Sequence, residues 1–133
     1  MGGGYKGDTG HYHSISENLF LMKEKFSYNN GYFGERGNNK KNNKVRRIES
    51  NDPSKTAKDF YDTLANGGKE EPIFDKKTGE EIGTKTVMAD GSVVTWRETS
   101  ISDGSPAVDI NIELSSDSGG IKDQKIHFIR GEV

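Results

Sequence analysis

The last third of the chain contains three short runs in which apolar and polar residues alternate. A period of two is typical of β-strands, because successive side chains of a strand point to opposite faces of a sheet. The predicted apolar face comprises Val94, Trp96, Val108, Ile110, Ile112, Ile126 and Phe128. The predicted polar face comprises Thr95, Arg97, Thr99, Asp109, Asn111, Lys125 and His127. We therefore expect a sheet that is buried on one face only.

The size and composition of the chain predict one domain with a small core. The chain has 133 residues, of which 29% are hydrophobic and 30% charged. The absence of cysteine excludes disulfides, thiol nucleophiles and cysteine-ligated zinc. No apolar run approaches the roughly 20 residues that span a bilayer, and the first residues do not resemble a signal peptide. We interpret residues 1–10 as a flexible lead-in and residues 11–133 as a single soluble domain.

Two helices are expected before the sheet. Ser14 or Ser16 can cap the first helix. The second helix is expected from about Pro53 to Leu64, because Asp52 is a favoured cap and proline is favoured at the first helical position. Glycines at 67 and 68 end it. The expected apolar faces comprise Leu19, Phe20, Met22 and Phe26 in the first helix, and Ala57, Phe60, Tyr61 and Leu64 in the second.

The remaining elements predict an α+β fold. Residues 84–88 and 93–98 form two strands joined by a tight turn at Asp90 and Gly91. Residues 107–114 and 121–129 form two more strands, whereas Lys69 to Gly83 is expected to be a loop or a weak hairpin. The fold class predicted is N-terminal helices packed on a twisted antiparallel β-sheet.

The residue types on the polar face fit the cleavage of RNA without a metal. The ribose 2′-hydroxyl must lose a proton, charge on the phosphoryl oxygens must be neutralised, and the departing 5′-oxygen must be protonated. His127 can transfer a proton, since histidine titrates near neutral pH. Lys125 and Arg97 can stabilise the charge, and Thr99 or Ser100 can position the phosphate by hydrogen bonds. We predict these five residues as the catalytic group.

A simpler interpretation of the same residues is an ordinary solvated sheet face. Arg97 can form a cross-strand pair with Asp109 or Glu113. Asp109 can orient His127 or Lys125, or stabilise the following loop, and we favour a structural role for it.

Two further groups of residues are candidates for function. His11 and His13 can supply a second proton-transfer group. They do not predict a metal site, because no further ligands follow at a suitable spacing. The run from Arg36 to Arg47 has six cations and no anion, although the net charge of the chain is −2. It predicts an RNA-binding edge formed by Lys40, Lys41, Lys44, Arg46 and Arg47, with a solvated loop as the alternative.

Several stretches of the chain resemble the C-terminal toxin domains of bacterial polymorphic toxins, which include contact-dependent growth inhibition toxins. These stretches are DGSVVTWRETS (90–100), SDGSPAVDINI (102–112) and SGGIKDQKIHF (118–128). The upstream stretches NKKNNKVRRIES (39–50) and TAKDFYDTLANGG (56–68) are also similar to that group. The resemblance covers most of residues 44–129. The slightly acidic pI of about 5.9 departs from the basic character of many such toxins.

The resemblance implies the barnase/EndoU/colicin/RelE (BECR) ribonuclease fold. It implies a metal-independent endoribonuclease toxin without a cofactor, with tRNA as the expected substrate and a cognate immunity protein as its inhibitor. Such a domain is secreted or delivered from the cell surface within a larger effector, and acts in the cytoplasm of the target cell. Carried over by position, the resemblance points to His127, Lys125, Arg97 and Thr99 or Ser100. The alternative is a non-catalytic module that binds RNA or an acidic protein.

Overall fold

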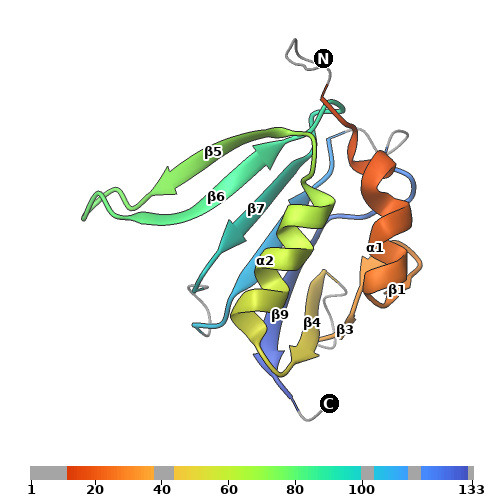
Figure 1. Ribbon diagram of the computed structural model, residues 1–133, viewed down its shortest axis with the longest axis horizontal. Coiled ribbons are helices and arrows are strands. Elements are labelled where there is room, and N and C mark those ends of the chain that lie inside the picture. Colours follow the sequence, from red (N-terminus) through yellow and green to blue (C-terminus); the bar gives the residue numbers. More distant parts are fainter. Residues whose placement is uncertain (1–11, 38–43, 100–103, 114–117, 132–133) are drawn as a thin grey trace.

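A mixed sheet with helices on one face forms the framework of the computed structural model, which describes residues 12–37, 44–99, 104–113 and 118–131 (Figure 1). The helical elements are the 3₁₀ turn η1 (Ile15–Asn18), α1 (Leu19–Lys25) and α2 (Pro53–Leu64). The strands are β1 (Tyr28–Asn29), β2 (Tyr32–Phe33), β3 (Glu35–Arg36), β4 (Val45–Ser50), β5 (Lys69–Phe74), β6 (Glu81–Val87), β7 (Val93–Arg97), β8 (Ala107–Asn111) and β9 (Gln124–Arg130).

Helix α2 has the bounds that the sequence predicts. The carboxylate of Asp52 accepts a hydrogen bond from the backbone N–H of Lys55 at 3.3 Å, and Pro53 is the first helical residue. The buried residues of the helix follow the spacing i, i+3, i+4 and i+7, which places them in one stripe. They are Ala57, Phe60, Tyr61 and Leu64, as predicted. This stripe packs on β4, β7, β8 and β9, and Figure 1 shows α2 lying across these strands.

Phe60 lies at the centre of an aromatic cluster that joins the helices to the sheet. Its ring centroid is 4.9 Å from that of Phe26, 5.1 Å from that of Phe33 and 5.4 Å from that of Phe128, in edge-on arrangements that aromatic rings favour. Phe128 belongs to β9, so α2 is fixed against the strand that also carries His127 on its other face.

The first helix differs from its prediction in which residues it buries. Ile15, Leu19 and Met22 are buried, whereas Phe20 is 71% exposed. The buried positions are four and three residues apart and therefore form one stripe, while Phe20 lies about 100° around the helix from Leu19. The placement of Phe20 on the apolar face was therefore wrong.

The α+β class is confirmed, but the sheet differs from the prediction in its strand directions and in the order of its elements. In the described part of the chain its order is β3-β4-β9-β8-β7-β6-β5. The turn at Asp90 and Gly91 joins β6 and β7 as predicted. However, β4 pairs in parallel with β9, so the sheet is mixed rather than purely antiparallel, and β1 to β4 precede α2. Residues 69–87, of which Lys69 to Gly83 were expected to be a loop or a weak hairpin, form the hairpin β5–β6. Its register shifts between Ile73 and Phe74, and it extends beyond α2 in Figure 1.

None of the helices in the described residues is both long enough and apolar enough to cross a membrane.

Candidate functional site

The face of the sheet turned away from α2 carries polar residues in two rows that run across the strands. The ladder register fixes both rows, since paired residues point to the same side of a sheet. From β6 to β3 the first row is Gly83, Arg97, Ala107, His127, Arg47 and Glu35. From β6 to β4 the second row is Lys85, Thr95, Asp109, Lys125 and Val45. We call the surface formed by these two rows the polar sheet face.

The predicted split between the two faces of the sheet is confirmed for the residues that lie on β7, β8 and β9. On β9, Ile126 and Phe128 are fully buried beneath α2, whereas Lys125 and His127 are half-buried on the polar sheet face. Arg97 shares this face from β7. The structure thus brings together the imidazole and the two cations that the sequence singled out.

A hydrogen bond to a neighbouring serine holds the ring of His127. The Oγ of Ser105 lies 3.0 Å from Nδ1 of the imidazole. Ser105 is held near β9 because the carbonyl of the next residue, Pro106, accepts a hydrogen bond from the N–H of Phe128 at 2.9 Å. This contact orients the imidazole, and the serine hydroxyl can donate to Nδ1 or accept from it.

Asp109 lies among the positive charges of the polar sheet face. It is directly opposite Lys125 on the β8–β9 ladder and opposite Thr95 on the other side. Burial raises the pKa of Asp109 above its usual value, and the nearby charges of Lys125, Arg97 and His127 oppose this rise in that order. The carboxylate is therefore within electrostatic reach of all three groups and accepts a proton more readily than an exposed aspartate does.

Two arginines flank His127 in the first row. Arg47 on β4 is its immediate neighbour, whereas Arg97 lies beyond Ala107, about 10 Å away across two ladder spacings. Ala107, which separates Arg97 from His127 in this row, has only a methyl side chain and is 2% exposed. Within the described part of the chain, the Nε atoms of Arg47 and Arg97 are buried without a hydrogen-bond partner.

The structure divides the basic run of the sequence between the two faces. Arg47 lies on the polar sheet face, but Arg46 points to the helix side. There its guanidinium donates to the carbonyls of Phe33 at 3.1 Å and Gly34 at 2.9 Å and lies over the ring of Tyr32. Lys44 is exposed just before β4. Arg46 therefore has structural contacts on the helix side, whereas Arg47 lies next to His127 in the first row of the polar sheet face.

Other candidates from the sequence are not brought to this face. Thr99 is exposed and follows the end of β7, so it does not lie on a strand. Ser100, His11, Lys40 and Lys41 are outside the described residues.

His13 lies near the β6–β7 turn, at the end of the sheet away from His127. Its carbonyl accepts from the N–H of Ala89 at 2.7 Å, and its N–H donates to the carbonyl of Gly67 at 2.8 Å. Gly67 has a φ of +84°, and a side chain there would collide with the imidazole of His13. His13 thus joins the N-terminal segment to the end of α2, and the structure does not bring it to His127.

For three residues of the site, the sequence did not predict the position or the role. Ser105 and the position of Arg47 opposite His127 were not predicted, and Asp109 was assigned a structural role. Asp109 was already visible in the period-two pattern of β8. By contrast, nothing in the sequence marks the parallel pairing of β4 with β9 that brings Arg47 to the site.

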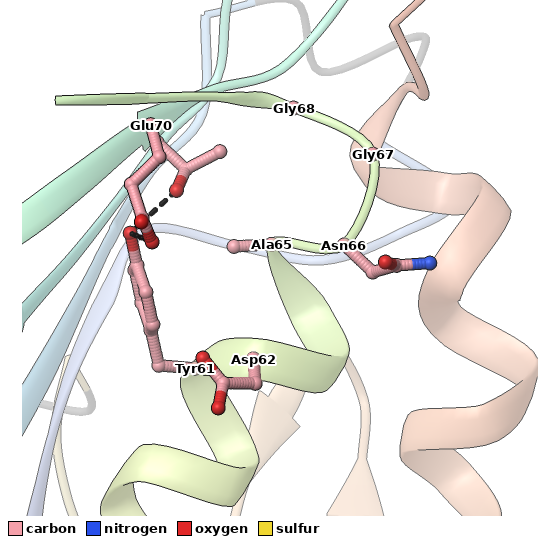
Figure 2. A pocket seen from close by; sticks show the side chains of 8 residues that line it. Tyr61, Asp62, Ala65, Asn66, Gly67, Gly68 and Glu70 are labelled. Carbon is pink, nitrogen blue, oxygen red and sulfur yellow. Dashed lines mark hydrogen bonds between the residues drawn. The ribbon is translucent and has the colours of Figure 1, made fainter. Parts of the chain in front are cut away.

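Two hollows among the described residues lie away from the polar sheet face, and carboxylates contribute to both linings. One hollow of about 350 Å³ lies at the end of α2, and Figure 2 shows Tyr61 pointing toward Glu70 inside it. The hydroxyl of Tyr61 donates to Oε2 of Glu70 at 3.0 Å, and the polar lining also includes Asp62, Asn66 and Thr86. A second hollow of about 560 Å³ lies between α1, β4 and α2, and its lining has three carboxylates and two lysines. Neither of these two hollows is lined by a residue of the polar sheet face.

No family model, curated protein or solved structure matches the chain. Among the described residues, no three His, Cys, Asp or Glu side chains are grouped so that they could hold a metal ion.

Proposed function

We propose that the protein is a metal-independent endoribonuclease that cleaves RNA by attack of the ribose 2′-hydroxyl on the adjacent phosphorus. The observation that supports this best is the convergence of His127, Lys125, Arg97 and Asp109 on the polar sheet face. Proton-transfer groups and cations within reach of one phosphate are what this reaction requires.

The positions of the side chains support a division of roles. Asp109 accepts the proton of the 2′-hydroxyl, because burial favours its protonated form. The 2′-oxygen then attacks the phosphorus, and Lys125 and Arg97 stabilise the negative charge that gathers on the phosphoryl oxygens. His127 gives a proton to the departing 5′-oxygen. The products are a 2′,3′-cyclic phosphate and a free 5′-hydroxyl, so no water and no metal is consumed in this step.

The wider proposal is a toxin domain of the BECR type, with tRNA as its substrate. It is supported by the resemblance of residues 44–129 to polymorphic toxin domains and by an α+β architecture with helices on one face of a sheet. Thr99 or Ser100, which follow β7 in the chain, are proposed to position the phosphate. In this proposal the domain is delivered within a larger effector and acts in the cytoplasm of the target cell.

An immunity protein is proposed to block the polar sheet face with carboxylates, because charge complementarity favours such a partner. A structure of the complex tests this proposal. We expect acidic side chains of the partner over Lys125 and His127, and a complex that leaves both residues open would contradict it.

Incubation of the purified protein with total RNA in EDTA tests the nuclease proposal. We expect cleavage of tRNA with cyclic phosphate ends, and the His127→Ala protein should cleave far more slowly. If tRNA and rRNA stay intact with both proteins, the proposal is wrong.

The same cations also fit a module that binds RNA without cutting it. This alternative predicts binding that weakens with salt and no new RNA ends. Expression in a bacterial host separates the two, since a toxin should arrest growth unless an immunity protein is present.

A further inference from the structure

We propose that Arg47 forms a second phosphate subsite, which holds the phosphate on the 3′ side of the nucleotide released by cleavage. The inference rests on the proposed function and adds the direction of the substrate. The RNA backbone would cross the sheet from β7 to β4, perpendicular to the strands, rather than run along one strand.

The order of side chains in the first row supports this direction. Arg97, Ala107, His127 and Arg47 follow one another on β7, β8, β9 and β4. Ala107 is 2% exposed, so neighbouring side chains cover it, and in this proposal the cleaved phosphate lies above them, between Arg97 and His127. Arg47 lies on the other side of His127, one ladder spacing of about 4.8 Å further across the sheet. A strand that passes over His127 therefore meets Arg47 next.

The proposed role of His127 decides which end of the substrate reaches Arg47. Because His127 protonates the departing 5′-oxygen, the released nucleoside lies on the His127 side of the cleaved phosphate. The 3′-phosphate of that nucleoside is the next charge along the backbone. It would then lie over β4, where Arg47 is the cation of the first row.

The surroundings of Arg47 fit a phosphate ligand. Its Nη2 lies 3.8 Å from Oε2 of Glu35, a long ion pair in which Glu35 is 69% exposed. Its Nε is buried without a hydrogen-bond partner in the described part of the chain, whereas the side chain as a whole is 39% exposed. Guanidinium groups bind phosphate through paired N–H donors. Glu35 ends the row on β3 and would repel a further phosphate, which limits the subsite to one.

Cleavage of short substrates tests the inference. A ribodinucleoside monophosphate carries only the phosphate to be cleaved, and adding a 3′-phosphate supplies the proposed ligand of Arg47. We expect the 3′-phosphate to raise kcat/KM about tenfold, the size of one charge-assisted contact. A 5′-phosphate on the same dinucleotide should change kcat/KM less than about twofold.

Substitutions assign the effect to Arg47. Arg47→Gln should abolish the gain from the 3′-phosphate, so that this variant cleaves the two dinucleotides with the same kcat/KM. Glu35→Gln should keep or enlarge the gain, because it removes the competing carboxylate. Lys77→Ala, in the β5–β6 turn, is the matched control that removes a cation elsewhere. It should change kcat/KM for neither dinucleotide. Circular dichroism confirms that each variant is folded.

Two outcomes would overturn the inference. One is that Arg47→Gln lowers kcat/KM by the same factor with and without the 3′-phosphate, and the other is that a 5′-phosphate raises kcat/KM as much as a 3′-phosphate does. Failure of the proposed function has a different signature, since no dinucleotide would be cleaved by any variant. In that case, titration with 2′-deoxy dinucleotides with and without the 3′-phosphate still tests the subsite. A 3′-phosphate that fails to tighten binding, or tightens it equally in Arg47→Gln, would refute it.

Discussion

Ser105 and His127 are joined by a hydrogen bond of 3.0 Å between the serine Oγ and the imidazole Nδ1. This contact links the segment before β8 to the middle of β9. It orients the imidazole of His127 on the polar sheet face.

Ser105→Ala should therefore lower kcat and leave KM nearly unchanged. The expected fall is about fivefold to tenfold, because one hydrogen bond of about 1 kcal/mol no longer orients the ring. Ser105→Thr retains the hydroxyl and should restore most of the rate. Steady-state kinetics on a tRNA substrate measures both constants. A loss that appears in KM, or that threonine does not rescue, would assign Ser105 a structural role instead.

His127→Ala should reduce the rate of RNA cleavage about 10²- to 10⁴-fold, as expected for removal of a proton-transfer group. RNA binding should persist, since the arginines and lysines of the polar sheet face remain. His13→Ala is the matched control, because His13 contacts Gly67 and Ala89 at the other end of the sheet. Single-turnover cleavage in EDTA compares the variants. A larger effect from His13→Ala would move the proton-transfer role away from His127.

Asp109→Asn should lower activity and raise stability at neutral pH. The pKa of Asp109 is raised in the folded protein, so the folded state binds this proton more tightly than the unfolded state does. Stability is therefore lost as the pH rises from the usual pKa of an aspartate to the raised value, and stays lower above it. The asparagine protein avoids this loss. Its unfolding midpoint should exceed that of the wild type at pH 7.

The same measurements near pH 3 serve as the control for Asp109→Asn. There the aspartate is protonated in both states, and the advantage of the variant should vanish. A variant that is less stable than the wild type at pH 7 would show that the attraction of Lys125 and Arg97 outweighs the cost of burial.

Local patterns predicted the parts of the fold that depend on neighbouring residues. The cap at Asp52 and the stripe that includes Phe60 determine α2, and the tight turn at Gly91 determines the β6–β7 hairpin. The alternation in β8 and β9 likewise placed Lys125 and His127 on one face. Each of these signals lies within about a dozen residues, where spacing alone reports which side chains share a face.

The pairing of β4 could not be predicted in the same way. Residues 45–50 do not alternate between apolar and polar, so their period gave no strand signal. Their partner β9 begins 79 residues after Val45, as the numbers of Val45 and Gln124 show. Parallel pairing over that distance depends on how α2 crosses the sheet. The position of Arg47 beside His127 is thus a tertiary property, and so is the burial that raises the pKa of Asp109.

The aromatic cluster predicts the largest loss of stability from a single substitution. Phe60 is fully buried and contacts the rings of Phe26, Phe33 and Phe128. Phe60→Ala should cost about 3 to 5 kcal/mol in the free energy of unfolding, because it leaves a cavity where α2 meets β9. Phe20→Ala is the matched control and should change stability by less than about 0.5 kcal/mol, since Phe20 is 71% exposed. Urea denaturation measures both, and similar losses would mean that α2 does not anchor the sheet.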